Sequence, residues 1–541
     1  MGEASNSVFV KAPNGSWEWR IRGEARLPLG GQLHNSAPSD PLAVRAGMRR
    51  IKELGGDLVI GAVNWDLFEP REGEYDFRQV DDQLSAAREY DLDLVLIFFG
   101  AFKNAGSTYA PSWVRGDLDR FPRALIGETA VAGFERAGRP VLSLFDSDLL
   151  EVEARALCAL SCRIAETDSE RRVVLLQVDN EVGLLGDSRD RSAGAEKAWK
   201  EPVPDRLIEA LASGELASTE LFALWEERGR RRGVPWEDSF GPGPRVDEAF
   251  MAWHFASHLE ALASVSKREL DIPHYANAWL GPQPGQEEAG QYPSGGPASR
   301  VLEVWRVAAP SIDLLAPDVY VDDVKGPLAR YGSSEGPLFI SESRLSAGNL
   351  AWAVGSGACG FSVFGIEDSR LDNQLSRLIR RVREAQDSIL AARRVSGVYP
   401  ILLEPGETSS IAIGRAVYTF SSAVDRLRSI LLDAGVRIRS DLGRALEETE
   451  TGLVPSFADT RALGVVIDVG DDEILVIGQG IMVDVEGRNG LRVEIDSVEE
   501  GRFIDGCWVR GRSLNGDERL EILPLDDIGT TRIRVLEPRG Q

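Results

Sequence analysis

Short apolar runs alternate with amphipathic helical stretches between about residues 27 and 385, and this alternation constrains the fold most strongly. Strands that alternate with helices belong to parallel sheets. The runs with the length and composition of buried strands are residues 29–34, 57–63, 93–99, 173–178, 274–279, 312–316, 337–341 and 360–364. Apolar spacings of three and four predict helices over 41–56, 77–91, 149–166, 250–270 and 350–358. Eight such strands with helices between them predict a (β/α)8 barrel, the TIM-barrel fold.

The pattern changes after about residue 390, where short alternating runs are separated by Gly, Asp and Asn. Regularly spaced short strands predict an antiparallel β-sandwich. We therefore expect an α/β chain of two domains. Residues 1–390 would form the catalytic barrel, with an insertion around 185–270, and residues 391–541 a smaller C-terminal β-sandwich.

Charge and composition narrow the choice of partners. With 61 Lys and Arg against 86 Asp and Glu, the net charge is −25, which disfavours nucleic acid and anionic membrane surfaces but not a neutral sugar. No stretch of eighteen apolar residues occurs, so no membrane span is expected. The first twenty residues lack a basic segment followed by an apolar one, so we predict a cytoplasmic protein without a signal peptide.

Cysteine and histidine are too scarce to indicate a disulfide framework or a metal centre. The chain has four of each. His254 and His258 stand four residues apart in a helical pattern, which favours an ordinary helix face over a metal edge. We expect no metal and no cofactor.

Two glutamates follow predicted strands at positions that suit catalysis. In a barrel of this kind the active site lies at the carboxyl ends of the strands. Glu181 follows the fourth predicted strand and Glu342 follows the seventh. Cleavage of a glycosidic bond needs two carboxyl groups, one protonated and one ionised. Either glutamate alone would be interpreted as half of a salt bridge, but the pair favours catalysis; sequence spacing does not decide between retention and inversion.

Several segments resemble the glycoside hydrolase family 35 β-galactosidases of clan A, in particular the bacterial branch with an added C-terminal β-domain. The matching segments are GGQLHNS (30–36), NWDLFEPREGEYDF (64–77), YAPSWVRGDLDRFPR (109–123), QVDNEVGLLGDSRDRS (177–192), NAWL (277–280), YPSGGP (292–297), APDVY (316–320) and EEGRFIDGCWVRGRSLNGDE (499–518). The resemblance implies a retaining mechanism with Glu181 as acid/base and Glu342 as nucleophile. It also implies that Asn180 bonds the sugar 2-hydroxyl and that the protein is a homo-oligomer.

The chain departs from the family pattern at two places. Eukaryotic-type members have Glu-Asn-Glu where this chain has Asp179-Asn180-Glu181, and their Gly-Pro-Tyr region after strand three is replaced by residues 98–111. The catalytic pair is unaffected, whereas the sugar and the aglycone preference stay open.

Aromatic and polar residues at the predicted strand ends are candidates for sugar binding. Flat rings cover the C–H faces of sugars, and amide or carboxyl groups hold the hydroxyls. The candidates are His34, Trp65, Tyr109, Asn277, Trp279 and Tyr320. Core packing is the alternative for Trp65 and for the nearby Trp113, and an outer or structural role is the alternative for Glu69.

The substrate is expected to be an oligosaccharide or other glycoside, most simply a terminal β-galactoside. The alternatives are the same mechanism on a β-glucoside, a β-fucoside or an α-L-arabinoside, and a carbohydrate-binding protein without catalysis. An aldolase or phosphate-binding barrel would need a Schiff-base lysine or a Gly-rich loop near strands seven and eight. No lysine follows Lys325, which disfavours that reading.

Overall fold

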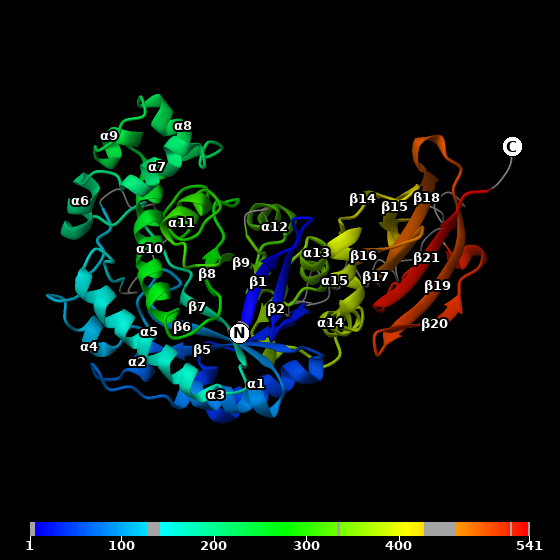
Figure 1. Cartoon of the computed structure of the whole chain (residues 1–541), viewed down its shortest axis with the longest axis horizontal. Helices are drawn as coiled ribbons and strands as arrows, with labels where there is room; N and C mark the ends of the chain where they lie inside the picture. The colour runs from blue at the N-terminus through cyan, green and yellow to red at the C-terminus, as the bar shows by residue number, and fades with distance from the viewer. Residues whose placement is uncertain (1–5, 128–140, 333–335, 427–460, 520–521, 539–541) are drawn as a thin grey trace, which may run out of the picture.

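The computed structural model describes residues 6–127, 141–332, 336–426, 461–519 and 522–538. Its centre is a parallel sheet with the strand order β10-β12-β4-β5-β6-β7-β8-β9-β11. The strands are β4 (Leu29–Gln32), β5 (Leu58–Asn64), β6 (Asp93–Lys103), β7 (Val173–Asn180), β8 (His274–Trp279), β9 (Leu314–Val319), β10 (Phe339–Ile340), β11 (Glu342–Ser343) and β12 (Gly360–Phe364). The predicted fold class is confirmed (Figure 1).

The barrel closes through its seventh strand, which is broken in two at Ser341. Before the break, β10 pairs with β12; after it, β11 pairs with β9. The two short strands therefore occupy one place in an eight-stranded barrel, and Glu342 is the first residue beyond the break. A change of pairing partner at this point leaves the glutamate at the carboxyl end of the barrel.

Helices cover the outside of the barrel. They are α1 (Pro41–Leu54), α3 (Arg78–Glu89), α5 (Ser147–Thr167), α10 (Pro244–Ser266), α11 (Leu302–Ala308), α12 (Lys325–Tyr331), α13 (Ala347–Gly355), α14 (Gln374–Glu384) and α15 (Gln386–Val395). Local sequence explains the ends of α1: Asp40 accepts a hydrogen bond from the Leu42 amide at 2.9 Å, and Gly55 ends the helix with a φ of 96°. In the described part of the chain no helix is both long and apolar enough to cross a membrane.

The eight predicted strands all occur, with shifts at their ends. Two of them, β8 and β12, have the predicted bounds, whereas β6 continues four residues beyond the predicted end at Phe99. That extension carries Lys103 to the same end of the barrel as Glu181. Its residues are fully buried, so the strand does not end where the polar sequence begins.

A three-stranded antiparallel sheet that the sequence analysis did not predict precedes the barrel. It contains β1 (Ser7–Lys11), β2 (Trp17–Ile21) and β3 (Glu24–Arg26). Trp19 is fully buried. Its ring packs against the ring of Phe339, at the start of the seventh barrel strand, with the two centroids 5.5 Å apart. The sheet thus adds to the apolar interior of the barrel at the end opposite the predicted site.

Helices beyond the barrel ring lie between β7 and β8, where the insertion was predicted. They are α6 (Ala193–Lys200), α7 (Asp205–Ser213), α8 (Glu220–Glu227) and α9 (Trp236–Phe240). Figure 1 shows them gathered at one end of the molecule, beyond α10 and α11. Trp236 packs edge-on against Phe250 of α10 at 5.5 Å, which attaches the insertion to the barrel.

The C-terminal part consists of two antiparallel sheets around a shared apolar core. One has the order β13-β16-β17-β21-β19-β20 and the other β14-β15-β18. Their strands are β13 (Val398–Leu403), β14 (Thr408–Ile413), β15 (Ala416–Ser422), β16 (Ala462–Gly470), β17 (Glu473–Gln479), β18 (Ile481–Gly487), β19 (Glu494–Ile504), β20 (Cys507–Ser513) and β21 (Gly529–Leu536).

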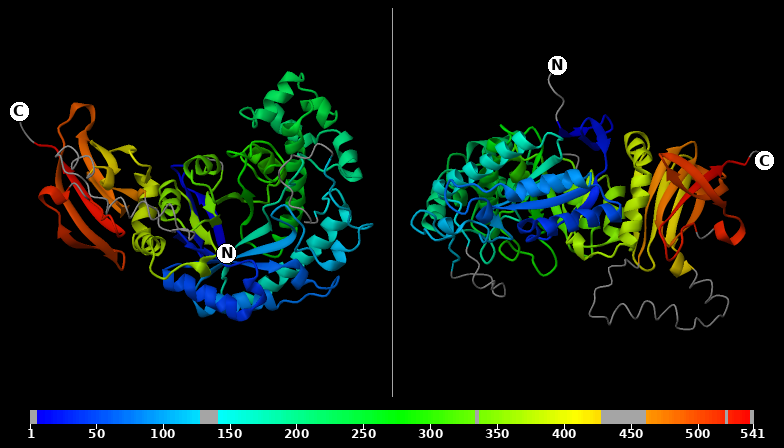
Figure 2. Two further views of the ribbon diagram at one scale, coloured as in Figure 1. Left: turned by 180° about the vertical axis from the view of Figure 1, so that it is seen from behind. Right: turned by 90° about the horizontal axis from the view of Figure 1, so that it is seen from below.

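The larger C-terminal sheet packs against the barrel helices α13, α14 and α15 (Figure 2). Residues of the sheet such as Val465 and Ile477 belong to the same apolar cluster as the barrel helices. The two parts therefore share buried surface. The predicted domain boundary between residues 390 and 391 stays a prediction, close to the gap between α15 and β13.

Candidate active site

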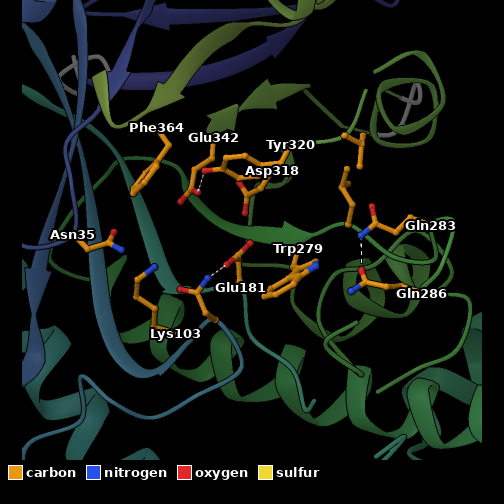
Figure 3. A pocket seen from close by; sticks show the side chains of 13 residues that line it. Asn35, Lys103, Glu181, Trp279, Gln283, Gln286, Asp318, Tyr320, Glu342 and Phe364 are labelled. Atoms are coloured by element: carbon orange, nitrogen blue, oxygen red, sulfur yellow. Dashed lines mark hydrogen bonds between the residues drawn. The ribbon is translucent and has the colours of Figure 1, made fainter. Parts of the chain in front are cut away.

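A cavity of about 560 Å3 opens at the carboxyl ends of the barrel strands (Figure 3). Its volume lies in the range of small-molecule sites. The lining residues are Asn35, Lys103, Asn104, Glu181, Trp279, Leu280, Gln283, Gln286, Asp318, Tyr320, Val321, Glu342 and Phe364. The structure thus brings both predicted catalytic glutamates to one cavity, although 161 positions separate them in the sequence.

Glu342 is held by donors from three other strand ends. Its Oε1 accepts from Gln32 Nε2 at 2.9 Å and lies 3.5 Å from Asn180 Nδ2, and its Oε2 accepts from the Tyr320 hydroxyl at 2.8 Å. All three donors are neutral groups, and together they fix the orientation of the carboxyl group. A nucleophile in a double displacement requires an oriented carboxylate.

Glu181 follows the last residue of β7 and has a left-handed backbone. Its φ is 45°, and the φ of Asp179 is 57°. Such conformations are rare for residues with a side chain and occur where surrounding contacts enforce them, often at functional sites. The backbone N–H of Glu181 donates to Asn277 Oδ1 at 2.8 Å. The side-chain NH2 of Asn104 donates to the Glu181 carboxyl.

Asn277 links the strand ends around the glutamates but does not line the cavity. Its Oδ1 also accepts from Gln177 Nε2 at 3.0 Å, and its Nδ2 donates to Asp318 Oδ2 at 2.7 Å. The sequence made Asn277 a candidate for sugar binding, whereas in the structure its side chain is buried and bonds protein groups. Asn277 therefore positions the backbone of Glu181 and the carboxyl of Asp318.

Asp318 is a third carboxyl in the cavity wall, on β9. Burial first, and then the negative charges of Glu342 and Glu181, raise the pKa of Asp318 well above its usual value. Burial and the neighbouring Glu342 likewise raise the pKa of Tyr320, so its hydroxyl remains a donor over the whole working pH range. The cavity thus favours the neutral form of Asp318.

The resemblance implies that Asn180 bonds the sugar 2-hydroxyl. In the structure, however, Asn180 is not among the residues that line the cavity. It is fully buried; its Oδ1 accepts from Lys103 Nζ at 2.8 Å and its Nδ2 faces Glu342. The side chain lies behind the cavity wall, between Lys103 and Glu342.

Besides Asn180 and Asn277, three more of the predicted sugar-binding residues lie outside the cavity lining. His34 pairs with Asp368 at 3.0 Å and packs against Phe364. Trp65 is fully buried, and its indole N–H donates to the Glu69 carboxyl at 2.7 Å. This agrees with the alternative that Trp65 packs in the core. The Tyr109 ring lies against Phe99, with centroids 5.0 Å apart. Trp279 and Tyr320 do line the cavity.

Sequence reasoning missed much of the lining. The missed residues are Asn35, Lys103, Asn104, Gln283, Gln286, Asp318 and Phe364, together with the Glu342 partner Gln32. Gln32 and Asp318 lie inside predicted or observed strands, and a polar residue within an apolar strand is a signal that could have identified them. Gln283 and Gln286 lie on a loop after β8, where no periodicity marks them.

A buried acidic cluster lies behind the site. Glu153 Oε2 is 2.7 Å from His258 Nε2, and the amides of Ala101 and Phe102 donate to Glu153 and Asp179 respectively. Burial raises the pKa of Glu153 to about 8, and burial and Glu153 raise the pKa of Asp179. The pair therefore retains a proton at neutral pH, and the cluster ties the ends of β6 and β7 to α5 and α10.

Two groups of described residues combine side chains of metal-ligand type. One is this cluster of Glu153, Asp179 and His258; the other is Cys158, Cys162 and Glu269. In the first group the 2.7 Å contact is that of a hydrogen bond, so a shared proton accounts for the arrangement. The predicted helix-face role of His254 agrees with its ring contacts to Phe145 and Phe250.

Known protein families match two segments of the chain. The glycoside hydrolase 42 family, described as beta-galactosidase, matches residues 40–211, and a domain of unknown function, DUF5597, matches residues 380–523. Each match covers less than half of the chain. The match names family 42, so the finer prediction of family 35 is not supported by it. No curated protein sequence matches the chain.

Solved structures with a similar fold include glycosidases. The β-galactosidase of the haloarchaeon Halorubrum lacusprofundi is 15% identical, with a TM-score of 0.45 over 66% of this chain and 58% of its own. The enzyme of Marinomonas ef1 is 14% identical, with a TM-score of 0.45 over 67% and 60%. An endo-1,4-β-mannanase of Eisenia fetida is 14% identical, with a TM-score of 0.41 over 70% and 95%.

This chain spans about three fifths of the length of the two β-galactosidases. The family match over residues 40–211 and the closed (β/α)8 barrel together support a glycosidase.

Proposed function

We propose that the chain is a retaining glycoside hydrolase that removes terminal β-galactosyl groups, with Glu342 as nucleophile and Glu181 as acid/base. The observation that carries the proposal is that both glutamates line one cavity at the carboxyl ends of β7 and the seventh strand. The family match to β-galactosidases supports the choice of sugar. The alternatives are the same mechanism on a β-glucoside, a β-fucoside or an α-L-arabinoside.

In the proposed first step Glu342 attacks the anomeric carbon while Glu181 gives a proton to the leaving oxygen. The bond from the anomeric carbon to that oxygen breaks, and a bond to a Glu342 oxygen forms. Glu181, now ionised, then takes a proton from water, which displaces Glu342 from the sugar. The hydrogen bonds from Gln32 and Tyr320 would orient Glu342 in both steps.

The test compares wild type with Glu342→Gln on aryl β-galactoside, β-glucoside, β-fucoside and α-L-arabinoside. Loss of the nucleophile removes the covalent route, so we expect kcat to fall by several orders of magnitude. Glu384→Gln, a change at a surface ion pair with Arg381, is the matched control and should keep full activity. Equal activity of wild type and Glu342→Gln would contradict the assignment.

Retention is tested by the anomeric form of the first product. Proton NMR during early turnover should show the sugar released with the configuration of the substrate. Release of the opposite anomer would exclude double displacement. A wild type that cleaves no sugar in the panel would contradict the proposed activity and favour the alternative of a carbohydrate-binding protein.

A further inference from the structure

Two cysteines on α5 lie beside a carboxyl group that a different helix brings to them. Cys158 and Cys162 are four residues apart and half-buried, and residues at this spacing lie on one face of a helix. Glu269, three residues beyond the end of α10, is exposed. The two sulfur atoms and one carboxyl oxygen of Glu269 all lie within 4.8 Å of one another. The sequence spacing indicated only the two thiols, and the packing of α10 on α5 adds the third group (Figure 1).

Hydrogen bonds beside this group fix the separation of the two helices. The hydroxyl of Ser161, next to Cys162, lies 2.8 Å from the hydroxyl of Ser266, the last residue of α10. The Ser266 oxygen also lies 2.7 Å from Nε2 of His274, the first residue of β8. Ser161, Ser266 and His274 are buried. The main chain that carries the thiols and the carboxyl group is therefore held in a position that one shared ligand can use.

Two thiols and a carboxyl group are the donor set of a thiophilic divalent cation. Thiolate sulfur selects soft and borderline metals such as zinc, whereas magnesium and calcium prefer oxygen ligands. Two sulfur atoms bound to one tetrahedral zinc ion lie about 3.8 Å apart, so small side-chain rotations suffice to bring the three groups to a common ion. Three protein ligands leave the fourth position for a water molecule.

Exposure separates this group from the acidic cluster behind the active site. Glu153, Asp179 and His258 are all buried and contain no sulfur, and a proton accounts for their closest contact. Cys158 and Cys162 are only half-buried, and Glu269 is exposed, so an ion can reach them from solvent.

We propose that Cys158, Cys162 and Glu269 form a zinc site that fastens α5 to the segment after α10. On binding, each thiol gives up its proton to solvent and its sulfur donates an electron pair to Zn²⁺, while Glu269 binds through a carboxylate oxygen. The site lies where α5 and α10 lead into β7 and β8, at the end of the barrel opposite the cavity. It is therefore independent of the proposed glycosidase function.

The binding experiment uses the full chain, stripped with a chelator and kept reduced. Excess Mg²⁺ in the buffer occupies surface carboxylates. Zn²⁺ is titrated in competition with a chromophoric chelator, and Co²⁺ in a separate titration reports thiolate ligands by sulfur-to-metal charge-transfer absorption. For wild type we expect one tightly bound ion per chain, this absorption, and a Tm that rises with added Zn²⁺. Cys507→Ser, at an exposed cysteine on β20, is the matched control and should behave as wild type does.

Two sets of substitutions test the ligands. The double variant Cys158→Ser, Cys162→Ser should lose the charge-transfer absorption and the rise in Tm. Glu269→Gln keeps both thiols and should weaken zinc binding by at least about 10-fold, because even groups behind the ligands of a metal contribute that much. Since Glu269 is exposed, this variant tests the site even if the double variant fails to fold.

Zinc binding of equal strength in wild type and the double variant would overturn the inference, because the ion would then sit at other carboxylates of this acidic chain. Absence of saturable zinc binding to wild type would overturn it as well. So would an unchanged zinc affinity of Glu269→Gln.

Discussion

The carboxyl group of Glu342 accepts hydrogen bonds on both of its oxygens, from side chains that come from different strands. A hydrogen bond to a charged group contributes more than one between neutral groups, about 1.5–3 kcal/mol. At the residue scale, the candidate nucleophile is therefore oriented by its neighbours. Each donor should have a measurable share in the rate.

Tyr320→Phe removes the hydroxyl that donates to Glu342 Oε2 at 2.8 Å. We expect kcat/KM on the preferred aryl glycoside to fall by about 10- to 100-fold, because one stabilising contact to the carboxylate is lost. Tyr331→Phe is the matched control, since its buried hydroxyl donates to the Pro297 carbonyl away from the cavity. That control should lower stability without changing kcat/KM; equal rate losses in both variants would contradict the assignment.

At the scale of elements, the ends of β6 and β7 are held by one buried cluster. The amides of Ala101 and Phe102 donate to Glu153 and Asp179, which come from α5 and β7. A Cβ at Gly100 would lie 2.2 Å from a Glu153 oxygen, so only glycine allows β6 to pass this close. The cluster thus sets the position of four site residues that follow it: Lys103, Asn104, Asn180 and Glu181.

The Glu153 carboxyl makes stability depend on pH. Burial raises its pKa from 4.5 to about 8, so the native state holds a proton that the unfolded chain has lost between these values. The free energy of unfolding should therefore fall as pH rises from 4.5 to 8. Glu153→Gln removes this titration. The Tm of the variant should therefore rise relative to the Tm of wild type as the pH is raised from 5 to 8.

Thermal unfolding at pH 5, 6, 7 and 8 measures this difference. A constant Tm difference between Glu153→Gln and wild type over this range would contradict the expected pH dependence.

At the scale of the whole molecule, the C-terminal sheets and the barrel are joined by close packing. Gly355, at the end of α13, lies so near β13 that a Cβ there would come within 2.4 Å of the Pro400 backbone. Backbone cannot yield as a flexible side chain does. The approach of helix and sheet therefore depends on this glycine.

Gly355→Ala should lower Tm by several degrees, although alanine normally favours a helix over glycine by about 1 kcal/mol. Overpacking against fixed backbone costs about 1–3 kcal/mol and outweighs that gain. Gly336→Ala is the control, because no atom of the described residues lies within 4 Å of the added Cβ. An unchanged or higher Tm for Gly355→Ala would show that the sheet can move away from the barrel at no cost.

The sequence by itself determined the order of the barrel strands and the places of Glu181 and Glu342. Apolar runs of strand length alternate with helical periodicity, and these are local signals that burial imposes on the chain. A residue that follows a strand of a parallel barrel lies at its catalytic end whatever the rest of the sequence contains. The N-terminal sheet was not predicted, because its strands are short and mix apolar with charged residues.

Only the tertiary structure decided which side chains surround the two glutamates. Gln32 and Glu342 are 310 residues apart, and no local pattern relates them. Asn180, a predicted site residue, is buried behind the cavity, whereas Lys103, for which no role was predicted, reaches the cavity wall because β6 extends beyond its predicted end. Burial and hydrogen-bond partners depend on how distant strands meet, and that meeting is a property of the folded chain.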